Sequence, residues 1–233
     1  MSSSLVNHVA SFIRNCCESL PDLKSHHNAY PIIEKEDIFI VNEMHECRGV
    51  RKVHLETGYT DNIEVMHCVL YPDPDYPIPI FGADIVATPT VVTAAIADIS
   101  PVYKTDNIYK KLSKIANRYE FKEKRPLPEW ADIFSPYCQF MRLRTEEEKS
   151  LYGCMIEEFI DFYVDIVKKA KKDTNWVNTM LRFDDQIHYC KQQRKNKKTK
   201  AVLSKWFSPE FAEGYINDIL FDVPPIPLSL IHI

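Results

Sequence analysis

Residues 64–101 constrain the fold most, because ionisable side chains stand there inside segments that are otherwise apolar. Prolines and threonines divide this stretch into three runs rich in β-branched and apolar residues, a pattern typical of consecutive antiparallel strands. The runs are 63–71, 79–88 and 91–98. Alternation along the second run puts Asp84 on the face opposite Ile85. Asp84 is then either an ordinary residue of a strand edge or bulge, or a functional polar residue on an apolar face of the sheet.

Two further runs, 36–43 and 49–57, precede this stretch and predict two more strands joined by a turn near residues 44–49. In the second of these runs, His54 and Glu56 lie on one face. Helical periodicity and capping residues predict helices on both sides of the five strands. The expected helices are 5–20, 106–119, 145–172, 185–207 and 208–220. A sheet with helices before and after it in the chain is the α+β arrangement.

The chain has 233 residues, which predicts one domain over 1–224 and an irregular, proline-containing tail over 225–233. No apolar run approaches the ~20 residues of a membrane span, and the N-terminus lacks the apolar core of a secretion signal. We therefore expect a cytoplasmic protein. The seven cysteines are scattered without CxxC spacing, which predicts reduced thiols rather than disulfides or a structural zinc site.

Basic residues gather in two places, although the net charge of the chain is −4. The clusters are Lys168, Lys169, Lys171 and Lys172, and Arg194, Lys195, Lys197, Lys198, Lys200 and Lys205. Each cluster is either a solvated helix face or a surface for an acidic partner. A sequence pI near 6.1 and the lack of a nucleic-acid-binding motif argue against nucleic acid.

The polar residues of the sheet suggest two kinds of site. Two histidines and two carboxylates, from His54, Glu56, His67 and Asp84, could bind the iron of a metal-dependent oxygenase, but their spacing is not that of a facial triad. The same residues could instead be satisfied polar groups without chemistry. With five glycines in the chain, neither GxGxxG nor GxxxxGK[ST] occurs, so a Rossmann or P-loop enzyme is not expected.

Seven segments, in this order, resemble the ferredoxin-dependent bilin reductases, and within them the phycocyanobilin-forming enzymes and their phage-type relatives. The segments are KVHLE (52–56), MHCVLYP (66–72), PIFGADIVATP (79–89), TAAIADISP (93–101), LPEWADIFSPYCQFMR (127–142), QIHYCKQQRKNKKTKAVL (186–203) and ILFDV (219–223). The resemblance implies a three-layer α/β/α sandwich with a central antiparallel β-sheet. It also implies biliverdin IXα as substrate, ferredoxin as external donor of single electrons, and no bound cofactor or metal.

Under this resemblance, Asp84 corresponds to the aspartate that gives the first proton to the tetrapyrrole. His67 corresponds to its histidine partner, and Glu56 to the glutamate beside the exocyclic vinyl group. The residues that correspond to substrate-binding positions are His54, Thr93, Arg142, Gln193, Asn196 and Lys198. An enzyme that puts electrons onto its substrate must also supply protons, for which buried carboxyl groups are suited.

One position departs from the family pattern. Lys197 stands where the phycocyanobilin-forming enzymes have an aspartate beside Asn196. This exchange and the resemblance to the phage-type members favour phycoerythrobilin as product, through 15,16-dihydrobiliverdin, whereas Glu56 favours phycocyanobilin. We expect phycoerythrobilin, with phycocyanobilin as the alternative, in a cyanobacterial cell or a phage-infected host.

Ferredoxins are acidic, so the second basic cluster is the expected docking surface, with Arg194, Lys195, Lys197 and Lys200 as its members. The family leads us to expect a monomer. A bilin-binding protein without catalysis would share the pocket but would have no need of Asp84.

Overall fold

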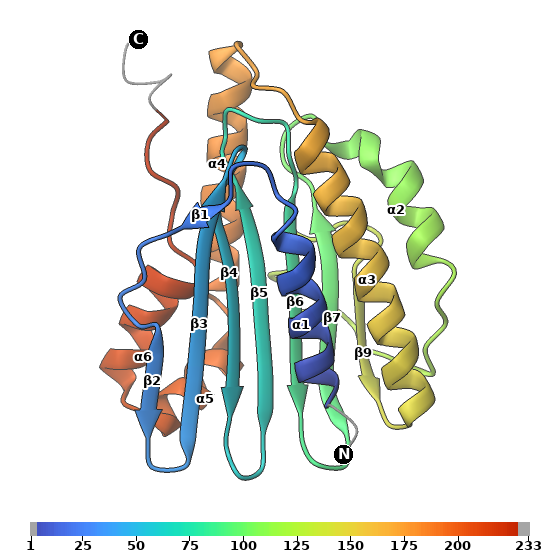
Figure 1. Cartoon of the computed structure of the whole chain (residues 1–233), viewed down its shortest axis with the longest axis vertical. Coiled ribbons are helices and arrows are strands. Elements are labelled where there is room, and N and C mark those ends of the chain that lie inside the picture. Colours follow the sequence, from blue (N-terminus) through green and yellow to red (C-terminus); the bar gives the residue numbers. More distant parts are fainter. Residues whose placement is uncertain (1–3, 228–233) are drawn as a thin grey trace.

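The computed structural model describes residues 4–227, and helices cover both faces of its central sheet (Figure 1). Within these residues, nine strands form one antiparallel sheet. They are β1 (Lys24–Ser25), β2 (Ile32–Lys35), β3 (Ile38–Cys47), β4 (Val50–Tyr59), β5 (Glu64–Pro72), β6 (Ile80–Ala87), β7 (Val92–Ser100), β8 (Glu123–Lys124) and β9 (Gln139–Leu143). The helices are α1 (Leu5–Cys17), α2 (Tyr109–Ala116), α3 (Glu146–Lys169), α4 (Trp176–Gln193), α5 (Lys197–Trp206) and α6 (Pro209–Tyr215), with a 3₁₀ turn η1 (Asp106–Ile108) and a π-helical turn η2 (Ile216–Leu220). The predicted three-layer α/β/α sandwich is confirmed.

Strands β3 to β7 follow one another as a meander, and β9 extends the sheet beside β7. The five strands of the meander are the ones that the sequence predicts, with bounds shifted by a few residues. β3 continues through the region expected to turn, and the turn falls at Gly49, whose φ is +85°. A Cβ at Gly49 would also lie 2.8 Å from Ile78 Cδ1, so the tight turn requires glycine.

Helices α1 and α3 pack on one face of the sheet and enclose the larger part of the apolar core (Figure 1). Both helices begin where the sequence provides a cap. Ser4 Oγ accepts a hydrogen bond from Asn7 N, and Thr145 forms the predicted capping box with Glu148. Alternate residues of the strands, among them Leu55, point into this core and form a rigid backing for the opposite face.

Two of the helix predictions are wrong in their bounds. The helix expected over 185–207 begins nine residues earlier, at Trp176, and is broken into α4 and α5. The break occurs because Asn196 caps the start of α5, where its side chain accepts a hydrogen bond from Lys198 N. The helix expected over 106–119 is shorter, since η1 occupies its first turn and α2 ends at Ala116.

Helices α4, α5 and α6 lie behind the β3–β5 side of the sheet and leave part of the same face without a helix (Figure 1). Several residues of β6, β7 and β9 that point to this side are half-buried, whereas their neighbours on the α3 side, such as Ala83 and Met141, are fully buried. We call this surface the open strip; its residues are Asp84, Val86, Ala94, Ile96, Phe140 and Arg142. A flat apolar molecule could lie on it.

The chain after η2 has no regular secondary structure over residues 223–227. The expectation of an irregular tail over 225–233 can be compared only over 225–227, because the remaining residues lie outside the described part. The boundary of the domain at residue 224 stays a prediction. Among residues 4–227, none of the helices is long and apolar enough to cross a membrane.

Candidate active site

Strand register places four polar side chains next to one another across the sheet. Asn42 on β3 pairs with Glu56 on β4, Glu56 with His67 on β5, and His67 with Asp84 on β6. Directly opposed residues of antiparallel strands point to the same face, so the four form a continuous polar row. The polar row ends at the open strip, where Asp84 pairs with Ile96.

His67 and Asp84 form an ion pair at the border between the covered and the open part of the sheet. His67 Nδ1 lies 2.6 Å from Asp84 Oδ1, and the side chains are 10% and 44% exposed. Burial disfavours the imidazolium, but the carboxylate of Asp84 outweighs it, and the pKa of His67 is raised above its usual value. His67 Nε2 is buried without a hydrogen-bond partner. The pair can therefore hold a proton near neutral pH, next to the open strip.

The raised pKa of His67 gives a pH dependence that can be measured. The imidazolium persists above the usual histidine pKa of ~6.5, so turnover should be retained through neutral pH and fall as the pH rises past the raised pKa. NMR titration of the His67 ring nitrogens alongside kcat checks this. In Asp84→Asn the ring should titrate at lower pH, because the carboxylate that stabilises the imidazolium is gone. A His67 ring that titrates at the same pH in both proteins would contradict the assignment.

Glu56 is buried between the sheet and α6. Tyr215, the last residue of α6, lies with its hydroxyl 2.5 Å from Glu56 Oε2 and 2.9 Å from Asn42 Oδ1. Burial raises the pKa of the Glu56 carboxyl, so its protonated form is favoured. Tyr215 has a single hydroxyl hydrogen for two acceptors. A protonated Glu56 that donates to Tyr215 leaves this hydrogen for Asn42, so both contacts are then satisfied.

His54 lies behind the polar row and is fully buried. Asn42 Nδ2 donates to Tyr30 O, so the Asn42 oxygen accepts from His54 Nε2 at 2.7 Å. Burial, followed by the positive charge of His67, lowers the pKa of His54 well below its usual value. His54 is thus a neutral imidazole that packs edge to face against His67, with ring centroids 5.6 Å apart. It orders the polar row and has no direct access to the open strip.

The other predicted substrate-binding residues lie around the edges of the site. Thr93 Oγ1 donates to Val86 O, and Gln193 Nε2 donates to Tyr189 OH. Arg142 lies on the open strip, with Nη1 3.1 Å from a Glu123 oxygen. Its Nε is buried without a partner. Of the remaining two, Asn196 caps α5 and Lys198 is exposed.

Four residues at the site were not predicted from the sequence. Asn42, Tyr215 and Phe221 reach the polar row from segments whose pairing no local pattern reveals. The fourth is Arg125, which lies 5.0 Å from the centre of the Phe140 ring and donates from Nη1 to Thr93 O. An arginine stacked at the edge of the open strip is suited to bind a carboxylate there.

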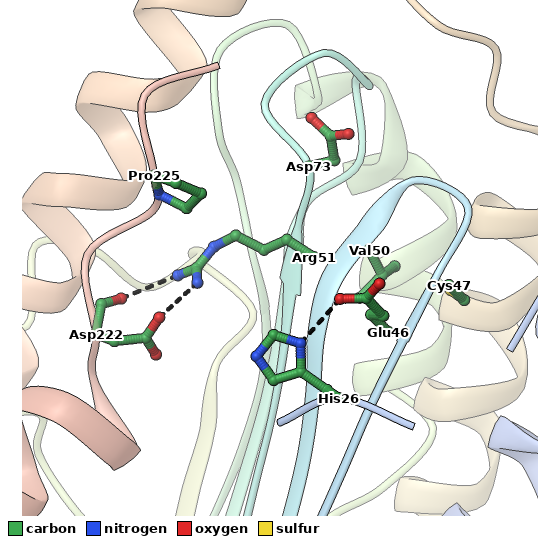
Figure 2. A pocket seen from close by; sticks show the side chains of 8 residues that line it. All are labelled: His26, Glu46, Cys47, Val50, Arg51, Asp73, Asp222 and Pro225. Atoms are coloured by element: carbon green, nitrogen blue, oxygen red, sulfur yellow. Dashed lines mark hydrogen bonds and ion pairs between the residues drawn. The ribbon is translucent and has the colours of Figure 1, made fainter. Parts of the chain in front are cut away.

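Two hollows of the surface lie away from the polar row. The larger one, of about 480 Å³, is drawn in Figure 2, and its polar side chains pair with one another, His26 with Glu46 and Arg51 with Asp222. The other, of about 350 Å³, is lined by Tyr103, His188 and their neighbours. Among residues 4–227, no three histidine, cysteine or acidic side chains are placed to hold a metal ion, so the metal-site hypothesis gains no support from the geometry.

An acidic residue paired with an imidazolium beside an apolar strip is an arrangement that can present a proton to a ligand lying on the sheet. The sequence profile described as ferredoxin-dependent bilin reductase matches residues 18–222. The chain belongs to this family of oxidoreductases, which take electrons from ferredoxin as an external donor.

Curated relatives agree with the family assignment. The chain is 39% identical over 236 residues to phycocyanobilin:ferredoxin oxidoreductase of Synechococcus sp. (strain CC9902), a match that covers 96% of this chain and 94% of the relative. It is 41% identical over 197 residues to the enzyme of the same name from Prochlorococcus marinus (strain MIT 9313), covering 83% and 74% of the two chains.

Solved structures support the fold. Phytochromobilin synthase from tomato in complex with biliverdin matches with a TM-score of 0.80 and 16% identity, over 94% of this chain and 83% of that one. The structure of PcyX matches with a TM-score of 0.61 and 19% identity, over 93% and 98% of the two chains. At these identities the likeness concerns the fold.

Proposed function

We propose that the enzyme reduces biliverdin IXα to phycocyanobilin, with electrons from reduced ferredoxin and protons from the polar row. The observation that carries this proposal is the continuous row of Glu56, His67 and Asp84 at the border of the open strip. The tomato enzyme of the same fold is in complex with biliverdin, and the curated relatives are named for phycocyanobilin. These names favour phycocyanobilin over phycoerythrobilin, the product expected from the sequence.

The chemistry requires proton donors in two places. Each carbon–carbon double bond that is reduced consumes two electrons and two protons, and phycocyanobilin formation reduces both the A-ring diene and the D-ring vinyl group. The pair of His67 and half-exposed Asp84 holds a proton beside the ligand surface, and Asp84 passes this proton to the ring system. Glu56, whose buried carboxyl has a raised pKa, supplies a proton to the vinyl group.

The substrate also carries two propionates, which need basic partners. Arg142 has an unpaired Nε on the open strip, and Arg125 stacks on Phe140 beside it. A planar guanidinium binds a carboxylate through two parallel hydrogen bonds. We assign the propionates to these arginines, with Thr93, whose carbonyl accepts from Arg125, beside them.

An anaerobic assay with biliverdin IXα and reduced ferredoxin tests the proposal, with the products separated by chromatography. Phycocyanobilin supports it. Phycoerythrobilin, the second candidate, is favoured by the exposed Lys197 in place of an aspartate, and as product it would overturn the vinyl-reducing role of Glu56. Biliverdin that binds but is never reduced would indicate a bilin-binding protein without catalysis.

Ferredoxin docking is assigned to the exposed lysines where α4 meets α5. Lys195 and Lys197 are exposed, whereas Lys200 pairs with Glu213 and Arg194 binds backbone carbonyl groups. Exposed charges contribute mainly to the rate of encounter with an acidic partner. The docking surface therefore consists of Lys195 and Lys197.

We expect Lys195→Gln/Lys197→Gln to raise KM for ferredoxin, by roughly three- to tenfold if each charge contributes about 0.3 to 0.7 kcal/mol. The effect should shrink with added salt, because the Debye length falls from about 8 Å at physiological ionic strength to ~3 Å at 1 M. Steady-state kinetics at varied ferredoxin and salt measure both. The double variant Lys168→Gln/Lys169→Gln, in the other basic cluster, is the matched control. An equal rise of KM in both variants would argue against a local docking surface.

A further inference from the structure

Glu56 and His67 of the polar row both touch one short segment of the chain, residues 215–222, which we call the C-terminal clamp. Tyr215, at its start, is hydrogen-bonded to Glu56. Phe221, near its end, packs edge-on against His67, with ring centroids 5.5 Å apart and an interplanar angle of 86°. The position of the clamp therefore fixes the surroundings of both side chains.

Side chains of the sheet hold the clamp by its backbone carbonyl groups. Lys52 Nζ donates to Ile219 O at 2.8 Å, and Tyr71 OH donates to Leu220 O at 2.8 Å. Arg51 donates to both the carbonyl and the carboxylate of Asp222, as Figure 2 shows. These contacts fix the two flanks of Phe221.

The carbonyl of Phe221 itself is bound by Arg194, the residue that caps the C-terminus of α4. Arg194 Nε and Nη2 lie 3.2 and 2.9 Å from Phe221 O, and Nη2 also donates to Asn217 O at 3.0 Å. The guanidinium is thus directed toward the carbonyl ends of η2, where a positive charge is favourable. It is half-buried and turned away from solvent, unlike its neighbour Lys195.

We propose that Arg194 is a positioning residue that holds Phe221 against His67, and that it does not belong to the ferredoxin docking surface. The inference rests on the proposed role of His67 as a proton donor. Phe221 lies against His67, whose Nε2 is buried without a partner. A displaced Phe221 ring would admit water to this nitrogen and loosen the imidazole beside the substrate.

Arg194→Gln separates the two roles, since glutamine removes the charge and the guanidinium fork at a chain position next to Lys195. For a positioning role, kcat should fall roughly tenfold, less than the ~100-fold that a 1 Å misplacement can cost, while KM for ferredoxin and its salt dependence stay as in the wild type. The pH at which His67 titrates should also shift, because water reaches its ring. Lys195→Gln should show the opposite pattern, a raised and salt-sensitive KM.

A double-mutant cycle with Phe221→Leu tests whether Arg194 acts through Phe221. Leucine keeps an apolar side chain but removes the ring, so it should lower kcat and shift the His67 titration in the same way. The two losses should not multiply in the double variant, because both remove one contact. Arg194→Lys, which can still donate to Phe221 O, should restore part of the activity and serves as the probe if Arg194→Gln does not fold.

Three results would overturn the proposal. They are a raised ferredoxin KM with normal kcat in the Arg194 variants, losses that multiply in the cycle, and an unchanged titration of His67. Different measurements would contradict the proposed function itself. They are wild-type protein that leaves biliverdin unreduced, and an Asp84→Asn variant that is still active. The two failures can therefore be told apart.

Discussion

Asp84→Asn is expected to stop the reduction of biliverdin while the substrate remains bound. Asparagine matches the shape of aspartate but cannot give a proton, and loss of a general acid costs typically ~10² to 10⁴ in rate. It also removes the negative charge that faces His67 Nδ1 at 2.6 Å. Single-turnover assays with reduced ferredoxin, followed by absorption, should show bound biliverdin that accepts electrons slowly or accumulates as a radical.

The matched control is Asp132→Asn. Asp132 is paired with His188 and Gln192 and lies outside the polar row and the open strip. This variant should turn over at a near-normal rate and show the His67 titration of the wild type. Turnover of Asp84→Asn within about threefold of the wild type, far from the ~100-fold minimum for a lost acid, would remove Asp84 from the mechanism.

Glu56→Gln is expected to halt the reaction after one of its two reductions. Glutamine fits the buried site and can still bond Tyr215, but it has no acidic proton for the vinyl group. A dihydrobiliverdin should therefore accumulate. The rate of phycocyanobilin formation should fall by about 100-fold, the lower end of the range for loss of a general acid. Chromatography of the products over time measures the partition. Glu64→Gln, at the start of β5, is the matched control.

The pH dependence of the same step follows from the pKa of Glu56. Burial raises this pKa, so the proton is present below it and is lost as the pH rises through it. The wild-type enzyme should therefore release more of the intermediate at high pH. A product mixture that does not change with pH, together with full conversion by Glu56→Gln, would show that another group reduces the vinyl.

The sheet could be predicted because its strands are runs of β-branched and apolar residues divided by turn residues and prolines. Side chains of a strand alternate between its two faces, so the facing of His54 and Asp84 follows once these runs are recognised as strands. β9 was not predicted, since residues 139–143 sit in an aromatic run without clear alternation. The division of α4 from α5 was missed because Asn196 reads as one polar residue of a helix until its capping bond is seen.

The site could be predicted in part. Glu56, His67 and Asp84 were expected on one face, but strand register was needed to place them in direct lateral contact. Asn42 and Tyr215 could not be found, because their partners are distant in the chain and Tyr215 reads as a buried aromatic of a helix. Arg194 reads as one cation of a basic run. Only its contacts with the clamp distinguish it from Lys195.

The uncovered part of the sheet has a consequence for the life of the protein in the cell. Val86, Ile96 and Phe140 are half-buried, and no helix of the described chain packs against them. In the function proposed above, the bound bilin would cover this part of the sheet. A ligand that binds only the folded state adds about 2.7 kcal/mol at a hundred times its Kd. Protein without bound bilin should unfold more often and be cleaved by proteases faster. The supply of bilin would therefore set the amount of this enzyme in the cell.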